Sequence, residues 1–396
     1  MKKRQSPGKG TCSVWAGEEE YWMQHATQVP VVHSVSFEYK DVETWQQVAL
    51  GKRKGHIYSR NTNPTVEVFE KKICRLEGAA AATSASTGMG IISSTLFALL
   101  LPGQKVVSVK DTYGGTNKIF TEFLPRINVR VALCDTTDHD AIEDEISRGC
   151  DLLYLETPTN PTIKVIDLAR LSSAGKKAGA LVVVDNTFAT PVNQLPLELG
   201  ADLVLHSATK FLGGHADALG GVVCGDKQLV KRIFHYREIN GATLDPMSAY
   251  LLLRGMKTLA LRVERQNQNA LAISRFLDTH SKVKQVFYPG LESHEGHSIA
   301  TSQMKGFGGV LSFMLKEDTL KAVDTVLRNL TYAHSAANLG AVETIVGPPA
   351  TTSHVECSKE ERLKMGIPES LIRYSAGIED ISDLIDDLDH ALSKLP

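Results

Sequence analysis

Long hydrophobic runs and an excess of charge of one sign are both absent from this chain of 396 residues. The longest strongly apolar stretch, residues 90–101, is too short to cross a bilayer and ends at Pro102 and Gly103, so it is predicted to be a buried helix. The basic N-terminus leads into no apolar segment of the kind a secretory signal needs. The formal net charge of −2 gives no reason to expect nucleic acid or an anionic membrane as a partner.

Paired cysteines and clustered histidines are missing as well. The six cysteines include no Cys-x-x-Cys pair, and several lie in apolar runs, which is typical of reduced thiols in the core of a cytoplasmic protein. The thirteen histidines form no His-Glu-x-x-His motif or comparable ligand set, so no metal is assigned. The remaining composition, 42% hydrophobic and 22% charged, is that of an ordinary globular protein.

Short apolar runs alternate with helical segments between residues 61 and 250. Helices are predicted at residues 66–77 and 168–178, and strands at residues 105–109, 129–133, 152–155, 181–184, 203–205 and 221–224. This alternation predicts an α/β fold in which a mostly parallel sheet is covered on both faces.

The pattern changes on either side of this large domain. Residues 1–60 are irregular and are predicted to form an N-terminal arm that contacts a neighbouring subunit. Residues 251–396 are predicted to form a smaller C-terminal α/β domain, joined to the large domain by one long helix over residues 249–277 that has a place for a kink at Gly255.

Four polar residues, Tyr113, Asn160, Asp185 and Lys210, come just after predicted strands. Ligands of such sheets bind beyond the carboxyl ends of the strands, so we expect these four side chains to meet at one edge.

Lys210 and Asp185 together suggest pyridoxal phosphate (PLP) as the cofactor. A lysine condenses with the PLP aldehyde, and an acid pairs with the ring nitrogen. Each residue also has an ordinary interpretation: Lys210 as a surface lysine after a strand, and Asp185 as a turn or helix-capping aspartate. Their joint placement at two strand ends favours the cofactor.

Candidates for the phosphate are small or basic residues. Ser207 and Thr209 flank Lys210, and Gly88 and Met89 open an apolar helix whose first N–H groups suit an anion. Tyr58 and Arg60, two residues apart in an extended segment, can reach one phosphate together. The alternatives are an ordinary small-residue helix start and a solvated loop.

Tyr113 and Arg373 are candidates for contacts with the ring and the substrate. Tyr113, at a glycine turn, can stack on the cofactor and act as an acid or base. Arg373 lies in a strand-like stretch among apolar neighbours, where a buried cation needs an anion such as a substrate carboxylate. The alternatives are a common turn tyrosine and a salt bridge from Arg373 to Glu379 or Asp380.

The motifs together resemble the Cys/Met-metabolism PLP enzymes, the family of cystathionine γ-synthase. The resemblance runs from about residue 28 to the end, and its most specific parts are residues 58–65, 156–161, 185–191, 206–211 and 372–379. It implies the type I, aspartate-aminotransferase-like PLP fold, with residues 61–250 as the PLP-binding domain. It also implies a homotetramer whose active sites are shared between two subunits.

The resemblance also implies a role for each candidate. Lys210 carries PLP and moves the Cα proton, Tyr113 stacks on the ring and acts as the acid that expels the γ-substituent, and Arg373 binds the substrate carboxylate. Asn160 contacts the ring hydroxyl and Asp185 the ring nitrogen. The phosphate is bound by Gly88, Met89, Ser207 and Thr209, with Tyr58 and Arg60 from the neighbouring subunit.

Positions that separate members of the family give a mixed pattern. Ala337 stands where lyases and enterobacterial synthases usually carry a Glu for the distal amino group of cystathionine, and Asn338 replaces their Ser, as in many O-acylhomoserine sulfhydrylases; residues 349–354 also look sulfhydrylase-like. Gly115 replaces the Cys of methionine γ-lyases. Lys118 replaces an Arg usual in synthases and cystathionine γ-lyases. Residues 203–218 and 252–259 look like plant-type cystathionine γ-synthase.

The expected function is therefore γ-replacement on an activated homoserine, such as an O-acyl ester, with cysteine or another sulfur nucleophile. The alternative is a γ-lyase on cystathionine, methionine or another homoserine-skeleton amino acid. Two other classes of protein fit the sequence less well. A nicotinamide dehydrogenase lacks its Gly-x-Gly-x-x-Gly motif here, and a non-catalytic relative would not be expected to keep Lys210, Asp185, Tyr113 and Arg373.

Overall fold

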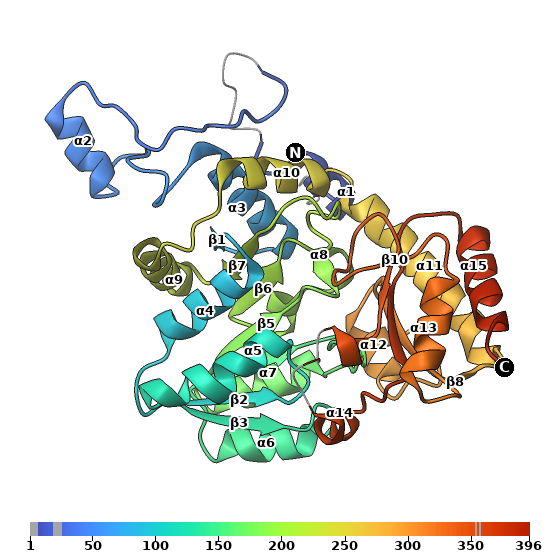
Figure 1. The fold of residues 1–396 in the computed structure, drawn as a ribbon. Coiled ribbons are helices and arrows are strands. Elements are labelled where there is room, and N and C mark those ends of the chain that lie inside the picture. The colour runs from blue at the N-terminus through green and yellow to red at the C-terminus, as the bar shows by residue number, and fades with distance from the viewer. Residues whose placement is uncertain (1–6, 19–25, 353–354, 356–357) are drawn as a thin grey trace, which may run out of the picture.

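Two β-sheets, each packed against helices, make up the computed structural model (Figure 1). The structure describes residues 7–18, 26–352, 355 and 358–396. The basic N-terminal residues 1–6 lie outside the described residues, and so do Ser353, His354 and Cys357.

The larger sheet has seven strands in the order β1-β7-β6-β5-β4-β2-β3. Five consecutive strands of this sheet are parallel to one another, namely β6, β5, β4, β2 and β3. Strand β7 is antiparallel to both β1 and β6. The strands are β1 (Ala81–Ala85), β2 (Lys105–Val109), β3 (Arg130–Cys134), β4 (Leu152–Glu156), β5 (Leu181–Asp185), β6 (Leu203–Ser207) and β7 (Gly221–Gly225). The prediction of a mostly parallel sheet is confirmed, and all six predicted strands are present to within two residues.

Strand β1 was not predicted from the sequence. Its residues, Ala-Ala-Thr-Ser-Ala, include one β-branched side chain and no bulky apolar one, so the segment has little intrinsic strand preference. It forms a strand because Ala81–Ala85 pairs along its whole length with β7.

Helices cover both faces of the larger sheet, as predicted. Leu203 and Val223 pack toward α4 and α9, whereas Val182 and Leu153 pack on the opposite face toward α6 and α7. The helical segments of this part of the chain are α3 (Pro64–Glu77), α4 (Gly88–Leu99), α5 (Gly114–Lys118), the π-helical turn η1 (Ile119–Phe123), η2 (Pro125–Ile127), α6 (His139–Ser147), α7 (Leu168–Lys177), α8 (Thr190–Asn193), η3 (Pro196–Leu199), α9 (Lys227–Asn240) and α10 (Pro246–Met256).

Helix α4 accounts for most of the apolar stretch at residues 90–101. Ile91 and Leu96 on this helix are fully buried in the core between α4 and the larger sheet. Within the described part of the chain, no helix is long and apolar enough to cross a membrane.

The smaller sheet has five strands in the order β10-β11-β12-β9-β8. These are β8 (Val283–Phe287), β9 (Val310–Leu315), β10 (His334–Ser335), β11 (Ile345–Gly347) and β12 (Leu371–Ser375). The pairs are antiparallel except for β10 with β11. Phe313 and Ile372 lie in the core that this sheet shares with three of the helices that follow α10, namely α11, α13 and α15. The helical segments of this part of the chain are α11 (Leu259–Thr279), α12 (His297–Gln303), α13 (Leu320–Arg328), η4 (Pro349–Thr351), α14 (Lys359–Lys364) and α15 (Ile381–Ser393).

The prediction of one continuous helix over residues 249–277 is wrong, because α10 ends at Met256 and α11 begins at Leu259. The interruption lies next to Gly255, where the sequence offered a place for a kink. Gly255 packs closely on the preceding part of the chain, since a Cβ there would approach the backbone oxygen of Gly213 to 2.0 Å. At the interruption the Gly255 carbonyl accepts hydrogen bonds from the backbone N–H of Thr258 at 3.3 Å and from the Arg262 side chain at 2.9 Å.

The N-terminal segment contains two helices, α1 (Lys9–Trp15) and α2 (Val42–Ala49), which the irregular sequence pattern did not predict. The part that carries α2 extends away from the rest of the molecule (Figure 1). Val42 and Trp45 on α2 are 80% and 50% exposed. An exposed apolar helix face of this kind is suited to contact another surface.

Candidate active site

The candidate site lies where the parallel strands of the larger sheet end. Asp185 is the last residue of β5 and stands opposite Glu156, the last residue of β4. Ser207 ends β6, and Lys210 follows three residues later. The predicted convergence at the carboxyl edge is therefore present in the structure.

Lys210 is mostly buried and its amine contacts the C-terminal part of the chain. Nζ donates a hydrogen bond of 2.8 Å to Oδ1 of Asn338. Burial, and then the positive charge of Arg373, lower the pKa of Lys210 to about 8. About a tenth of the amine is then unprotonated at pH 7, far more than for an ordinary lysine, and the neutral form is the one that acts as a nucleophile or proton acceptor.

Arg373 on β12 is buried without an anionic partner. Its Nη1 donates to Oδ1 of Asn160 and its Nη2 to the backbone oxygen of Asn338, both at 3.0 Å. Among the residues that the structure describes, no carboxylate lies within ion-pair distance of Arg373. Glu379 instead accepts hydrogen bonds from Thr344, so the alternative of a salt bridge to Glu379 does not hold. Burial lowers the pKa of Arg373 to about 10, and a bound anion would compensate that cost.

Asp185 is held by three donors. Its Oδ1 accepts from the backbone N–H (3.0 Å) and the hydroxyl (2.6 Å) of Thr187, and its Oδ2 lies 3.4 Å from the Tyr154 hydroxyl. Thr187 is fixed in turn, since its Oγ1 accepts from the backbone N–H of Ser207 at 2.9 Å. Burial raises the pKa of Asp185, and the Thr187 hydrogen bonds oppose that rise.

A cradle of small residues lies at the N-terminus of α4. The Thr87 hydroxyl accepts from the N–H of Gly90 at 2.9 Å. A Cβ on Gly88 would lie 2.8 Å from both Cβ and Oγ of Ser207, so only glycine lets the helix start approach β6 this closely. Unpaired N–H groups at the start of a helix, with a serine hydroxyl beside them, suit a phosphate.

Thr209 and Met89 border this cradle. Thr209 exchanges hydrogen bonds with Gly220 through its Oγ1, at 3.3 Å to the oxygen and 3.1 Å from the nitrogen. Met89 packs against the turn after Tyr113, since a Cβ on Gly115 would lie 2.7 Å from the Met89 sulfur. The donors and the shape of this region fit the phosphate and ring of PLP.

Tyr113 lies at the open side of the site. Its ring is 46% exposed, and its hydroxyl is near enough to Arg373 for the two groups to interact electrostatically. Its backbone N–H donates to Oε2 of Glu156 at 2.7 Å.

Glu156 is a site residue that the sequence analysis missed. Its buried carboxyl accepts N–H groups from both Tyr113 and Asn160, so it fixes the two loops that bring these residues to the site. Burial, and then the charge of Asp185, raise the pKa of Glu156 well above its ordinary range. An acid directly after an apolar strand was the signal, and it is the same signal that identified Asp185.

Tyr58 and Arg60 are not brought to Lys210 within this chain. The Arg60 guanidinium lies over the Tyr58 ring, 5.1 Å from its centroid, and the Arg60 backbone oxygen accepts from Arg237. Lys210, Asn338, Arg373 and Asn160 are joined by hydrogen bonds and form the Lys210 cluster. No hydrogen bond or ion pair found among the described residues joins the Tyr58 or Arg60 side chain to this cluster.

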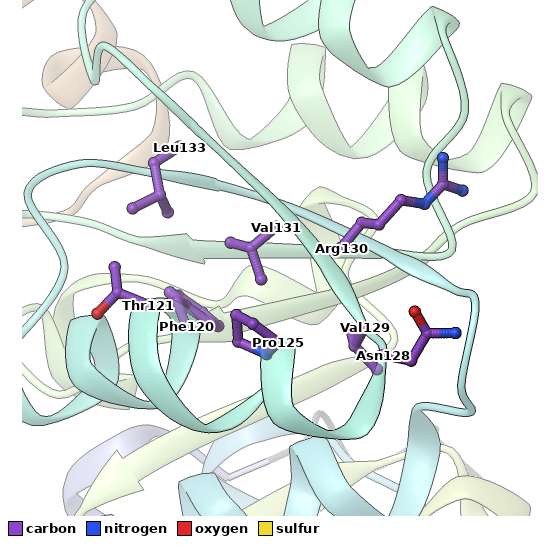
Figure 2. Close-up of a pocket in the computed structure, with 8 residues that line it drawn as sticks. All are labelled: Phe120, Thr121, Pro125, Asn128, Val129, Arg130, Val131 and Leu133. Carbon is purple, nitrogen blue, oxygen red and sulfur yellow. The ribbon is translucent and has the colours of Figure 1, made fainter.

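A hollow of about 530 Å³ lies elsewhere, between η1, η2 and strand β3 at the edge of the larger sheet. Figure 2 shows Phe120, Pro125 and Val131 gathered there. None of the predicted site residues lines it. The described part of the chain also contains no group of three or more His, Cys, Asp or Glu side chains that could hold a metal ion.

Comparison with known proteins adds to this geometry. Residues 10–393 match the family model described as "Cys/Met metabolism PLP-dependent enzyme". The chain is 41% identical to the L-methionine gamma-lyase of Fusobacterium nucleatum subsp. polymorphum over 98% of both chains. It is 42% identical to the cystathionine gamma-lyase of Bacillus subtilis, over 91% of this chain and 95% of that protein. The crystal structure of cystathionine gamma synthase from Xanthomonas oryzae pv. oryzae, in complex with aminoacrylate and cysteine, has a TM-score of 0.93 and 37% identity over 98% of both chains.

Proposed function

This chain belongs to the Cys/Met-metabolism PLP-dependent enzymes, and on that premise we propose that it catalyses γ-replacement on an activated homoserine. The substrate would be an O-acylhomoserine-type ester, and the incoming nucleophile would be cysteine or another sulfur nucleophile. The observation that carries the proposal is the pair Ala337 and Asn338, at the point where the C-terminal part of the chain contacts Lys210.

Residues at the carboxyl edge of the sheet would hold the cofactor. We propose that Lys210 binds PLP covalently, that Asp185 pairs with the ring nitrogen, and that Asn160 contacts the ring hydroxyl. The phosphate would lie in the cradle formed by the start of α4 and by the turn after β6, that is, Gly88, Met89, Ser207 and Thr209. The clearance at Gly88 and the unpaired helix N–H groups support this placement.

Bound PLP supplies an aldehyde for the substrate amine and a ring that accepts electrons from the substrate carbon. The chain's own residues would do the rest. Arg373, with neutral partners only, would bind the substrate carboxylate. Lys210, with its lowered pKa, would take the Cα proton, and the loss of a Cβ proton would then let the γ-substituent leave. Tyr113, at the open side of the site, would protonate the leaving group.

Position 337 supports an ester substrate over cystathionine. Cystathionine carries a second ammonium group at its far end, which an acid at this position would bind, and Ala337 presents an exposed methyl group there instead. The amide oxygen of the neighbouring Asn338 accepts a hydrogen bond from Lys210. An acyl group carries no ammonium group, so an O-acyl ester makes no demand for an acid at position 337.

A γ-lyase remains the second candidate, because two relatives with 41% and 42% identity carry γ-lyase names. One observation weighs against a methionine-type lyase. A Cβ on Gly115 would lie 2.7 Å from the Met89 sulfur and 2.9 Å from Cε1 of Tyr113, so the cysteine usual in methionine γ-lyases would displace Tyr113 or Met89.

We also propose that the enzyme works as a cytoplasmic homotetramer in which Tyr58 and Arg60 complete the neighbouring subunit's phosphate site. The support is that these two side chains lie on the extended N-terminal segment. Among the described residues, no hydrogen bond or ion pair joins them to the Lys210 cluster of their own chain. The exposed apolar residues of α2 on the same segment suit a subunit contact.

The test is product analysis on the holoenzyme. O-Acetyl-, O-succinyl- and O-phosphohomoserine, cystathionine and methionine are each supplied with and without cysteine, and thioether and 2-oxobutyrate are quantified. Formation of cystathionine from an ester plus cysteine is the expected result. Rapid 2-oxobutyrate release from cystathionine or methionine without a thiol would favour the lyase instead.

A further inference from the structure

Tyr154 is a buried tyrosine whose hydroxyl faces the acid of the candidate site. It lies near the end of β4, is fully buried, and packs edge-on against Phe120 with the ring centroids 5.3 Å apart at 78°. Its hydroxyl points to Oδ2 of Asp185 at 3.4 Å, with Thr116 beside it. A leucine or phenylalanine would fill this core position without adding a polar group, so the hydroxyl calls for an explanation beyond packing.

The two oxygens of Asp185 are not equivalent. Oδ1 accepts two hydrogen bonds from Thr187, whereas Oδ2 has Tyr154 as its partner among the described residues. The distance of 3.4 Å is longer than a fully formed O–H···O bond, as is common before a site has closed around its ligand. Tyr154 is therefore the donor that faces the less occupied oxygen.

We propose that Tyr154 is a positioning residue that keeps the Asp185 carboxylate ionised and aligned for the ring nitrogen of PLP. The inference rests on the proposed role of Asp185 and deepens it. Strand register supports it, because β4 and β5 place Glu156 directly opposite Asp185 and so fix the end of β4 against that acid.

The electrostatics agree in direction. Burial raises the pKa of Tyr154 well above its ordinary range, so the hydroxyl keeps its proton and can only donate it to a carboxylate. The same hydrogen bond lowers the pKa of Asp185 and so opposes the effect of burial. Thr187 acts in the same direction from the other oxygen. Removing the Tyr154 hydroxyl leaves the Thr187 hydrogen bonds and the charge of His206 to stabilise the carboxylate.

The experiment compares two cofactors on the apoprotein. PLP and 1-deazapyridoxal 5'-phosphate differ at the ring nitrogen, so a residue that acts through Asp185 affects the binding of the first and not of the second. Equilibrium dissociation constants are measured for wild type and Tyr154→Phe by quenching of protein fluorescence. We expect Tyr154→Phe to weaken PLP binding roughly fivefold and to leave the binding of the deaza analogue within error of wild type.

Tyr288→Phe is the matched control. Tyr288 is also a fully buried tyrosine, but its hydroxyl donates at 2.9 Å to the backbone oxygen of Gly308, next to β9 of the smaller sheet. The Tyr288→Phe variant should change the affinities for PLP and for the deaza analogue equally or not at all. Because Tyr154→Phe keeps the ring that packs on Phe120, thermal melting of the apoprotein should show that the variant folds.

Two results overturn the proposal: equal weakening of both cofactors, which would make Tyr154 a packing residue, and no weakening of either. Failure of the underlying assignments would look different, because it would appear in the wild type. A wild-type apoprotein that binds no PLP would refute the cofactor site, and one that binds both compounds equally would refute the pairing of Asp185 with the ring nitrogen.

Discussion

Lys210 combines a buried amine with a nearby fixed positive charge. Most lysines lie in water with a proton bound, and such an amine cannot attack an aldehyde. Here burial and the charge of Arg373 act in the same direction and lower the pKa to about 8. Asn338 holds the amine through an amide oxygen, which adds no charge to oppose them. The reactivity of this residue therefore depends on a second residue 163 positions away in the chain.

The reaction of the apoprotein with PLP should depend on pH through Lys210. The neutral amine is the reactive form, so the rate should rise as pH increases through about 8. In Arg373→Met the loss of the positive charge raises the pKa of Lys210, and the midpoint should move to higher pH. Stopped-flow absorbance after mixing with PLP measures both profiles. An identical midpoint in the two proteins would contradict the role of Arg373.

Gly88 should tolerate no side chain if the phosphate lies at the start of α4. A Cβ would come within 2.8 Å of Ser207, so Gly88→Ala must push the cradle open, and we expect a loss of PLP affinity of roughly tenfold or more. Gly90→Ala is the control, because a Cβ there meets its nearest atom, Thr87 Oγ1, at 3.2 Å. Equal affinities of the two variants in a fluorescence titration would place the phosphate elsewhere.

At the scale of elements, the turn that carries Lys210 is tied to the helices that follow it. Arg262 on α11 is buried and donates to the backbone oxygens of Phe211 (2.9 Å), Leu212 (3.3 Å) and Gly255 (2.9 Å). It therefore joins the Lys210 turn to the end of α10. The close approach of Gly255 to Gly213 belongs to the same junction.

The sequence predicted the strands and not this junction. Strands β4, β5 and β6 are short apolar runs, which a local pattern reveals, and the polar residues at their ends could be placed by topology alone. Gly255 indicated a place for a kink, but a local pattern does not show the full break at Lys257 and Thr258. That region also makes contacts, through Gly255 and Arg262, with residues about 40 to 50 positions earlier. Glu156 carried the same signal as Asp185 and was recognisable.

Arg262→Met should destabilise the apoprotein by on the order of 3 kcal/mol, because it leaves several buried carbonyl oxygens without a donor. Urea unfolding followed by circular dichroism measures the change. Arg254→Met, which replaces an exposed arginine on α10, should stay within about 0.5 kcal/mol of wild type. A similar loss of unfolding free energy in both variants would contradict the proposed role of Arg262 in joining the two segments.

At the scale of the whole molecule, the N-terminal segment is the part that the single chain does not explain. It extends from the body with apolar residues exposed on α2 (Figure 1). It also holds Tyr58 and Arg60 away from their own Lys210 cluster. A site completed by a second copy accounts for both observations, since a two-fold dimer exchanges the same segment in both directions.

Complementation tests the shared site. Lys210→Ala lacks the reactive amine, and Arg60→Ala should lose most of its phosphate affinity. When the two variants are co-expressed, mixed dimers contain one intact site, so activity should recover to about a quarter of wild type. Activity that does not exceed that of Arg60→Ala alone would mean that each chain completes its own site.

The most direct test of the central claim is the partition between replacement and elimination on one substrate. Holoenzyme is given O-succinylhomoserine with increasing cysteine, and cystathionine and 2-oxobutyrate are measured in the same sample. The account predicts that cystathionine becomes the dominant product as cysteine saturates, with 2-oxobutyrate falling in proportion. A yield of 2-oxobutyrate that stays constant as cysteine rises would contradict it and identify the enzyme as a lyase.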